Sequence, residues 1–326
     1  MSVSPVDLLG QEQDVDLSII IVNWNAKAFL QQCIQSFLKP THTYSFDIWV
    51  IDNGSTDGSP DMIRKEFSGV RLIHHDSNLG FAKANNIGIR ESRGRYICLI
   101  NSDVKVLNNC LGLLVSHMER HSRIGLIAPR ILNPDMTLQI SCYGFPNFWN
   151  SFCYAIGFDQ MFPRSRWLGG MYRRYWPYER VRLVDAVSGC FCMARREAIN
   201  QDGGLDENFF MYMEDFDWCK RLRQAGWDVV YFPEAQAIHY GGGSSSSTSD
   251  KYWIERSRSM LHYWHKHHGI LGRSYILLMM LVRHLLRIAQ GTFWYLFRAS
   301  ERMKFSSKIK DSRASIRWLL KLRRSK

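Results

Sequence analysis

Two short segments of the chain carry carboxylates in places where they could do chemistry. In the stretch ICLINSDVKV (97–106), four apolar residues are followed directly by Asn101, Ser102 and Asp103. Asn, Ser and Asp are common turn residues. At the end of a buried strand, however, a carboxylate can also hold a divalent cation, and hard oxygen ligands suit Mg²⁺ or Mn²⁺. The stretch by itself leaves both interpretations open.

The second segment, MEDFD (213–217), places three carboxylates within four residues at the expected start of a helix. Helical spacing puts Glu214 and Asp217 on one face and turns Asp215 away from them. These charges could simply favour the helix dipole, by about 0.3–1 kcal/mol. Apolar and aromatic residues flank them, though, and partial burial raises the pKa of a carboxylate towards the range of a general base.

Two further polar segments could contact a ligand. DNGSTDGS (52–59) contains neither a P-loop nor a dinucleotide fingerprint, but a carboxylate such as Asp52 can accept hydrogen bonds from a nucleobase or a ribose. In SNLGFAKANNIG (77–88), Gly80 permits close backbone approach, and Lys83 and Asn85 lie in the first turns of a helix, where anions are favoured. A flexible turn and a solvated helix start are the alternatives.

Alternating strands and helices position these segments. Continuous apolar runs predict strands, and spaced apolar residues predict helices. The expected strands cover 17–25, 47–52, 70–75 and 94–103. The expected helices cover 26–38, the residues after Asp57 through Phe67, 80–92 and 108–121. This alternation is typical of a parallel sheet with helices on both faces. Polar strand ends then gather at one rim, as expected for a ligand cleft: Asn23, Asn25, Asp52, Asn53, Asn101 and Asp103.

The second half of the chain is less regular. Residues 124–132 and 183–194 are predicted as strands around an aromatic-rich loop at 143–180. A helix over 213–226 ends at Gly226, which is suited to the position just after a helix. Residues 227–240 are predicted as a strand pair interrupted by Pro233, ending in His239 before a glycine- and serine-rich loop at 241–249.

The charge of the chain is unevenly distributed. Of the net +12 over 326 residues, residues 270–326 contribute 14 − 2 = +12 and the preceding residues 28 − 28 = 0. The eight cysteines are scattered, and the amino terminus shows no signal peptide, so we expect reduced thiols in a cytoplasmic protein. No nucleic-acid recognition module is evident.

The basic tail is also apolar. Residues 275–298 contain an eight-residue apolar run, shorter than the roughly 20 residues that span a bilayer. Arg283 and Arg287 share a helical face opposite Leu, Met and aromatic residues, which favours an in-plane interfacial helix. Each basic residue near an anionic leaflet adds about 1 kcal/mol. The alternative is a helical hairpin packed on the preceding domain.

The motifs, in their order, resemble the family 2 glycosyltransferases with the GT-A fold. The residues that carry the resemblance span 17 to about 247 and are IIIVNWN, VIDNGSTDGS, NLGFAKANNIG, LINSD, SGCFCMARREA, GGLDENFFMYMEDFDWCKRLRQAG and AIHYGGGSS. The NWN, NSD and HYGGGS variants are most similar to the rhamnosyltransferase-like branch that builds bacterial surface polysaccharides.

The resemblance assigns roles to the candidate residues. It implies that Asp103 ligates Mg²⁺ or Mn²⁺, with His239 as a further ligand, and that Asp215, beside Glu214, is the base that deprotonates the acceptor. Many relatives have Asp where this chain has Asn101, which leaves one carboxylate in the triplet. The residues expected to contact the nucleotide-sugar are Asn23, Asn25, Asp52, Asn53, Gly80, Lys83, Asn85, Asn101 and Ser102.

We therefore expect an inverting, metal-dependent glycosyltransferase on the cytoplasmic face of the cell membrane. It would move a sugar from a dTDP- or UDP-sugar to a lipid-linked or oligosaccharide acceptor. The expected fold is an α/β, Rossmann-like sheet in a catalytic domain at 16–250, with a nucleotide half at 16–122 and an acceptor half at 123–250. A flexible terminus at 1–15 precedes it, and a helical, membrane-associating extension at 251–326 follows. A non-catalytic nucleotide-sugar-binding scaffold and a sugar nucleotidyltransferase remain the alternatives.

Overall fold

The computed structural model describes residues 15–38, 44–241, 249–297 and 302–322. Most of the flexible terminus expected at 1–15, and most of the loop expected at 241–249, lie outside the described residues. The described chain forms two compact units. Unit 1 comprises residues up to Tyr143 together with Tyr178–Tyr252, and unit 2 comprises Gly144–Pro177 together with the residues from Trp253 onwards.

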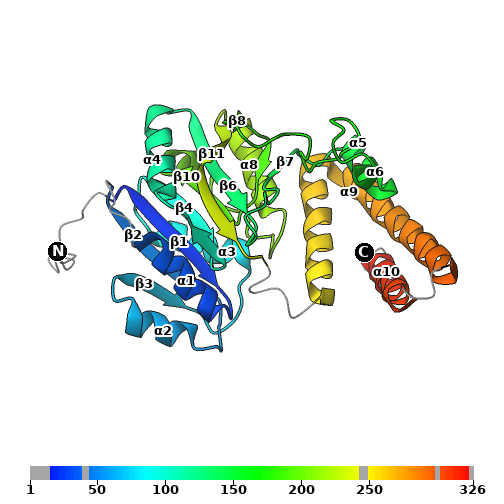
Figure 1. Cartoon of the computed structure of the whole chain (residues 1–326), viewed down its shortest axis with the longest axis horizontal. Helices are drawn as coiled ribbons and strands as arrows, with labels where there is room; N and C mark the ends of the chain where they lie inside the picture. The colour runs from blue at the N-terminus through cyan, green and yellow to red at the C-terminus, as the bar shows by residue number, and fades with distance from the viewer. Residues whose placement is uncertain (1–14, 39–43, 242–248, 298–301, 323–326) are drawn as a thin grey trace. The chain divides into compact units, whose positions relative to one another are not determined.

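The first half of unit 1 is built from alternating strands and helices (Figure 1). In chain order the elements are β1 (Leu17–Asn23), α1 (Lys27–Leu38), β2 (Phe46–Asp52), α2 (Ser59–Glu66), β3 (Val70–His74), α3 (Phe81–Glu91), β4 (Tyr96–Asn101), β5 (Val104–Val106) and α4 (Cys110–Arg120). The strands and helices predicted for this region are confirmed. The short strand β5 was not expected.

The second half of unit 1 corrects the sequence-based prediction. Its elements are β6 (Ile124–Leu132), β7 (Cys142–Tyr143), β8 (Arg182–Leu183), β9 (Ala186–Val187), β10 (Phe191–Arg195), α7 (Arg196–Asp202), α8 (Glu214–Gln224) and β11 (Asp228–His239). The strand predicted over 183–194 is wrong, because β8, β9 and β10 pair with different partners. The strand pair predicted over 227–240 is one strand, with a register shift between Phe232 and Gln236 around Pro233, which has no N–H for the ladder.

The main sheet runs in the order β3-β2-β1-β4-β10-β6-β11-β5, with β8 paired to β11. Strands β3, β2, β1 and β4 are mutually parallel, so their carboxyl ends share one edge. Strand β10 is antiparallel to β4 and β6, and β5 is antiparallel to β11. The β5–β11 pairing sets Val104 opposite His239, which brings the end of β4 beside the end of β11.

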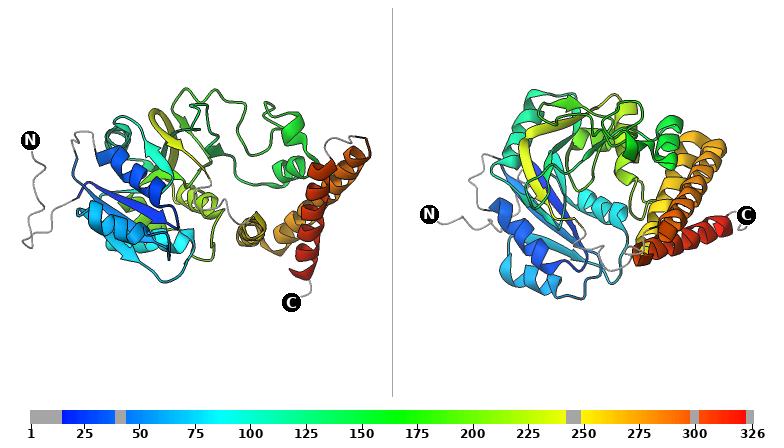
Figure 2. Two further views of the ribbon diagram at one scale, coloured as in Figure 1. Left: turned by 60° about the horizontal axis from the view of Figure 1, so that its bottom comes forward. Right: turned by 45° about the vertical axis from the view of Figure 1, so that its right-hand side comes forward.

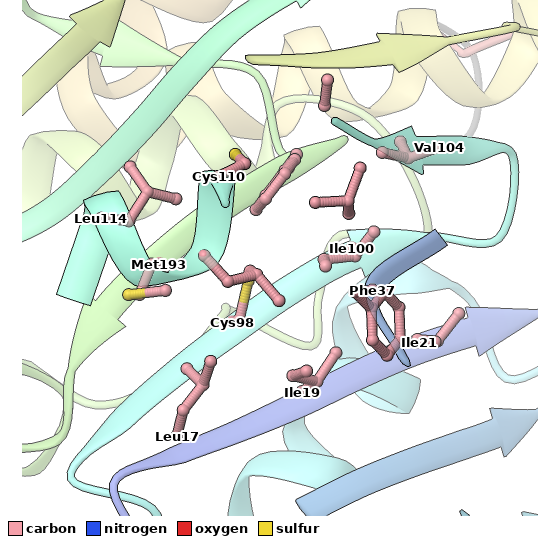
Figure 3. Close-up of a cluster of buried hydrophobic side chains, with 14 of the residues drawn as sticks. Leu17, Ile19, Ile21, Phe37, Cys98, Ile100, Val104, Cys110, Leu114 and Met193 are labelled. Atoms are coloured by element: carbon pink, nitrogen blue, oxygen red, sulfur yellow. The ribbon is translucent and has the colours of Figure 1, made fainter. Parts of the chain in front are cut away.

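Helices cover both faces of the sheet. On one face, Leu17, Ile19 and Ile21 of β1 join side chains of α1 and α4 in a single buried cluster (Figure 3). On the other face α3 lies against β1, where Gly88 leaves room for Ile20: a Cβ on Gly88 would fall 2.5 Å from Ile20 Cγ2. Burial on both faces explains why β1 is almost entirely apolar, with Ser18 as the one polar residue in LSIIIV.

Unit 2 is mainly helical. It contains α5 (Phe148–Ile156), α6 (Phe158–Met161), most of α9 (Ser249–Phe297) and α10 (Arg302–Leu322). Gly269, with φ of 64°, divides α9 into two arms (Figure 2). Helix α10 lies beside the second arm, where Ile309 Cγ1 would be 3.0 Å from a Cβ on Gly291. Residues 144–177, which we expected within the catalytic domain, thus group with the C-terminal helices, whereas the functional domain limits remain a prediction.

By length and composition, Trp253–Phe297 is apolar enough to cross a membrane, and it is the one such helix found in the described part of the chain. Its second arm exposes large apolar side chains, among them Leu278, Leu285, Phe293 and Leu296. These residues repeat at helical spacing, so they form an apolar stripe on that arm.

Candidate active site

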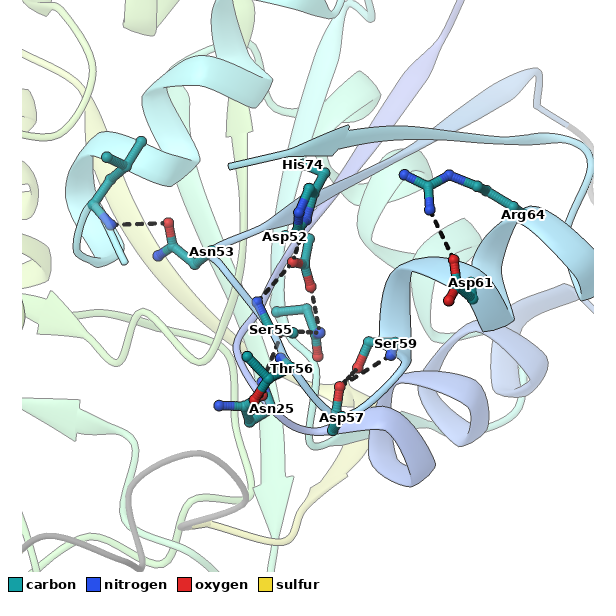
Figure 4. Close-up of polar contacts among 12 residues, drawn as sticks. Asn25, Asp52, Asn53, Ser55, Thr56, Asp57, Ser59, Asp61, Arg64 and His74 are labelled. Carbon is teal, nitrogen blue, oxygen red and sulfur yellow. Dashed lines mark hydrogen bonds and ion pairs between the residues drawn. The ribbon is translucent and has the colours of Figure 1, made fainter. Parts of the chain in front are cut away.

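The turn after β2 is organised by a buried carboxylate. Asp52 is fully buried and accepts hydrogen bonds from Asn23 Nδ2 (2.9 Å) and from the backbone N–H of Ser55 (3.0 Å). His74 Nδ1 lies 2.9 Å from Asp52 Oδ1 (Figure 4). Asn25, with φ of 51°, accepts a hydrogen bond from the N–H of Thr56 through its Oδ1. The structure gives Asp52 a role in ordering this turn, and its assignment to a nucleobase stays a prediction.

A second network ties β2 to the start of α3. Asn53 is buried; its Nδ2 donates to Asn78 Oδ1 and to the carbonyl of Gly80, and its Oδ1 accepts from the N–H of Leu79. Gly80 has a φ of 89°, and a Cβ there would lie 2.6 Å from the carbonyl oxygen of Phe210. Glycine is therefore required at this position, and the segment predicted to approach a ligand is held rigidly.

The structure places Asp103 and His239 side by side, although 136 residues separate them in the chain. Asp103 Oδ1 lies 3.3 Å from His239 Nε2, and the N–H of Tyr240 donates to the carbonyl of Asp103 (3.0 Å). Both contacts follow from the antiparallel pairing of β5 with β11. A carboxylate and an imidazole from two different strand ends therefore meet at one point.

Gln139 determines which nitrogen of His239 carries the proton. The Gln139 Nε2 donates to Asn133 Oδ1 (2.9 Å) and to the carbonyl of His239 (3.1 Å), which directs its Oε1 at His239 Nδ1 (2.7 Å). Because Oε1 can only accept, Nδ1 must donate. In the neutral imidazole the Nε2 lone pair then faces a carboxylate oxygen of Asp103.

Two facing acceptors suit a cation. A carboxylate oxygen and an imidazole nitrogen are ordinary ligands for Mn²⁺, and a carboxylate for Mg²⁺. Near the same strand end, Asn101 Oδ1 is buried without a hydrogen-bond partner among the described residues. No group of three or more His, Cys, Asp or Glu side chains is gathered for a metal in the described ranges. The donor set thus fits a cation that takes its remaining ligands from substrate and water.

The second candidate carboxylate, Asp215, lies at the start of α8. Its Oδ2 accepts from the N–H of Gly189 (3.0 Å) and its Oδ1 from the N–H of Phe216 (2.8 Å). Burial raises the pKa of Asp215, and these hydrogen bonds oppose the rise. The neighbouring Glu214 is 5% exposed, and its Oε2 has no hydrogen-bond partner among the described residues. Burial, and then the charge of Asp215, raises the pKa of Glu214 well above its usual range.

Cys190 connects the two candidate carboxylates. The Cys190 carbonyl accepts a hydrogen bond from the N–H of Asn101 (2.9 Å), and the N–H of the preceding residue, Gly189, donates to Asp215 Oδ2. Burial raises the pKa of Cys190 to about 12, and the nearby charges of Asp103 and Asp215 add to the effect. Both carboxylates therefore lie close to one residue of the loop that enters β10.

Not every predicted site residue joins this arrangement. Asn85 is buried and its Nδ2 donates to the carbonyl of Phe81 in its own helix, while Lys83 is exposed and Ser102 is buried. Asp217, the third carboxylate of MEDFD, is fully buried and pairs with Arg221 (2.8 Å). Its role is structural.

Comparison with known proteins decides the family. The model of Glycosyl transferase family 2 matches residues 18–202. The chain belongs to this family. It is 30% identical, over 240 residues, to the N-acetylglucosaminyl-diphospho-decaprenol L-rhamnosyltransferase of Mycobacterium tuberculosis, which covers 70% of this chain and 77% of that relative. It is 24% identical over 228 residues to the low-salt glycan biosynthesis hexosyltransferase Agl10 of Haloferax volcanii, covering 69% and 67%.

Solved structures agree on the fold of this glycosyltransferase. GalNAc-T7 with UDP, GalNAc and Mn²⁺ is similar with a TM-score of 0.55 at 17% identity, covering 92% of this chain and 55% of that one. The mannosyltransferase PcManGT of Pyrobaculum calidifontis, in complex with GDP-Man and Mn²⁺, is similar with a TM-score of 0.53 at 13% identity, covering 97% and 91%. The predicted GT-A fold, the family and the enzyme class are thereby confirmed.

Sequence reasoning missed two positions of this site. Gln139 lies 100 residues from His239 in the chain, and nothing in its local sequence indicates a contact with a strand end. Gly189 belongs to the SGCFCMARREA motif, but nothing in this motif indicates that the Gly189 N–H donates a hydrogen bond to Asp215. Both contacts arise from tertiary pairing.

Proposed function

We propose that this family 2 glycosyltransferase carries out an inverting, divalent-metal-dependent transfer from a nucleotide-sugar to a lipid-linked glycan. The observation that carries the proposal is that Asp103, paired with His239, and Asp215 both lie close to Cys190. An in-line displacement needs a base for the acceptor and a counter-charge for the leaving group. Unit 1 supplies residues of both kinds.

In this proposal Asp215 removes the proton of the acceptor hydroxyl. The acceptor oxygen bonds to the anomeric carbon as the bond from that carbon to the donor phosphate breaks, and a nucleoside diphosphate leaves. The hydrogen bond from Gly189 fixes the orientation of the Asp215 carboxylate, and burial makes it a stronger base than an exposed aspartate. Inversion requires no nucleophilic second carboxylate, in contrast to retaining glycosidases.

Asp103 and His239 would hold Mn²⁺ or Mg²⁺, which when bound would neutralise the charge of the leaving diphosphate. The chain's own contribution is to present Asp103 Oδ1 and His239 Nε2 in one direction, and Gln139 secures this by fixing the imidazole tautomer. Asn101 Oδ1, buried and unpartnered among the described residues, offers a further acceptor in place of the second carboxylate of many relatives.

The donor and acceptor follow from the relative named above. Its name specifies an L-rhamnosyl transfer to a diphospho-decaprenol-linked sugar, and we assign this chain a related lipid-linked acceptor and a dTDP- or UDP-sugar donor, with rhamnose to be tested first. The apolar stripe of α9 and the basic residues of 270–326 support association with the inner face of the cell membrane.

A donor panel tests the proposed reaction. Purified protein with Mn²⁺ is incubated with UDP-, dTDP- and GDP-sugars and a lipid-linked acceptor, and the nucleotide product is identified. We expect a nucleoside diphosphate, formed by the wild type and by the control Asp61→Asn, whose carboxylate is exposed, and not by Asp215→Asn, which still binds donor. Release of pyrophosphate would instead indicate a nucleotidyltransferase. Donor binding without turnover would indicate a scaffold protein.

A further inference from the structure

Unit 2 contains a cavity of about 180 Å³, and all of its lining residues belong to this unit. One water needs roughly 10–15 Å³ of such space, so the cavity can take a small polar group. The lining includes Arg256, Arg283 and Arg287, and it contains no Asp or Glu side chain. A cavity lined by three arginines and by no acidic residue attracts anions.

A buried, unpartnered polar atom points to a ligand in this cavity. His284 lines the cavity and is 5% exposed, yet its Nδ1 has no hydrogen-bond partner among the described residues. Burial, followed by the charges of Arg287 and Arg283, lowers the pKa of His284 to about 4. The imidazole is therefore neutral at pH 7, and Nδ1 can donate to an anionic oxygen in one of its tautomers.

The arginines are held in place by aromatic and polar groups. Arg283 stacks on the ring of Tyr154, 3.6 Å from its centroid, and donates to the Tyr154 carbonyl. Arg256 Nη2 lies 3.5 Å from the hydroxyl of Tyr172. The charge of Arg283 also acts on the buried Asp159, which does not line the cavity. Arg287 is exposed and reaches both this cavity and a neighbouring one of about 540 Å³, which Lys308 also lines.

The remaining lining of the first cavity is mainly apolar but includes polar side chains. Met260, Ile276, Met279 and Met280 belong to the apolar part, and Asn150, Ser151 and Ser257 to the polar part. The second arm of α9, which contributes Ile276, Met279 and Met280, also carries the exposed apolar stripe at 278–296. An occupant that combines a multiply charged headgroup with an apolar chain matches both features, whereas a free phosphate would use only the arginines.

We propose that this cavity binds the diphosphate group of a lipid, with Arg287 and Arg283 as ionic contacts and His284 Nδ1 as a neutral donor. We take this lipid to be the acceptor of the proposed transfer or the lipid-diphosphate product of that transfer. The identity of the lipid therefore rests on the proposed function. Two or three guanidinium groups match the charge of a diphosphate better than that of a singly charged phospholipid headgroup.

Direct binding tests the inference without catalysis. Geranylgeranyl diphosphate in neutral detergent is titrated into the full chain by calorimetry, with inorganic diphosphate and geranylgeraniol as comparison ligands. We expect the lipid diphosphate to bind more tightly than either, and Arg287→Gln to raise its Kd about tenfold, the loss expected for one charge-assisted hydrogen bond. The matched control is Arg317→Gln, which removes an exposed arginine of α10 that does not line the cavity.

Three results would overturn the inference: equal Kd changes in Arg287→Gln and Arg317→Gln, inorganic diphosphate binding as tightly as the lipid diphosphate, or phosphatidylglycerol vesicles competing as well as the lipid diphosphate. Because Arg287 is exposed, its replacement leaves folding intact, which an unchanged Tm verifies. If the wild type binds the lipid diphosphate and transfers no sugar, the proposed function fails and the cavity stands. If transfer occurs and Arg287→Gln binds like the wild type, the cavity assignment fails alone.

Discussion

Replacing Gln139 by leucine tests how the Asp103–His239 pair is prepared for a cation. Gln139 Oε1 is the acceptor that keeps the proton on His239 Nδ1, at 2.7 Å. Without it, the imidazole can adopt the tautomer with the proton on Nε2. That proton would then be donated to Asp103 Oδ1, 3.3 Å away, and both cation ligands would be occupied by each other.

The size of the effect follows from this geometry. Removing a partner that orients a metal-binding histidine costs about 10–100-fold in metal affinity, equivalent to roughly 1.4–2.7 kcal/mol. We therefore expect the midpoint of Mn²⁺ binding to rise by that factor in Gln139→Leu. The assay is electron paramagnetic resonance of free Mn²⁺ in the presence of a nucleoside diphosphate, followed by Mn²⁺ activation of sugar transfer.

The matched control is Gln31→Leu, which removes a half-buried glutamine of α1 that donates to Glu66 of α2 (2.6 Å). It should leave the Mn²⁺ midpoint unchanged. An unchanged midpoint in Gln139→Leu, with a Tm equal to that of the wild type, would refute the reasoning that the tautomer of His239 controls the site.

Three further predictions concern stability and membrane binding. Arg221→Met removes the ion pair between Arg221 and the fully buried Asp217 carboxylate (2.8 Å), so urea unfolding should show a loss of about 3–5 kcal/mol. Burial raises the pKa of Glu214, so the folded state binds the Glu214 proton more tightly than the unfolded state does. The free energy of unfolding should therefore fall as the pH rises above the ordinary pKa range of glutamate. Glu214→Gln should weaken this pH dependence. Leu285→Glu with Leu296→Glu should weaken flotation with anionic liposomes, because both side chains belong to the exposed apolar stripe.

Each of these has a matched control. Arg64→Met removes an exposed ion pair with Asp61 and should cost less than about 1 kcal/mol; an equal loss in Arg221→Met would contradict the buried-pair argument. Glu66→Gln, which removes a carboxylate of α2, is the control for Glu214→Gln, and an equal change in the two variants would contradict the argument from burial. Leu183→Glu changes an exposed leucine of unit 1. If it reduces flotation as much as Leu285→Glu with Leu296→Glu does, the exposed apolar stripe is not the membrane contact.

The first half of the sheet could be predicted because its signals are local. The run LSIIIV forms a strand buried on both faces, and residues such as Leu30, Ile34 and Phe37 lie on one stripe of α1. Parallel strands joined by helices place their carboxyl ends together, so the polar rim formed by Asn23, Asp52 and Asn101 followed from the order of the elements alone.

The second half could not be predicted because its pairings are long-range. Residues 182–195 alternate too briefly to show that β8 pairs with β11, β9 with β7 and β10 with β4. Strand β11 looked interrupted because Pro233 is a strand breaker, but a bulge accommodates it. The grouping of 144–177 with the C-terminal helices depends on contacts such as Phe148 with Trp264, which no periodicity reveals.

The candidate site, like the sheet, has a part that could be predicted from the sequence and a part that could not. Asp103, His239 and Asp215 were identified by type, position and family resemblance, and the structure places Asp103 against His239. Their supporting contacts, from Gln139 and from the N–H of Gly189, depend on segments that fold back over long sequence distances. Residue types at strand ends suggest chemistry, whereas the groups that orient them are visible only in three dimensions.

The most direct test of the account is the nucleotide product of Asp215→Asn compared with that of the wild type, followed by ³¹P NMR with Mg²⁺ and a dTDP- or UDP-sugar donor. Donor affinity is measured alongside, so that a binding defect is distinguished from a catalytic one. The account predicts that the wild type forms a nucleoside diphosphate with an acceptor present, and that Asp215→Asn binds donor normally and forms none. Nucleoside diphosphate formation by Asp215→Asn at the wild-type rate would contradict the assignment of Asp215 as the base.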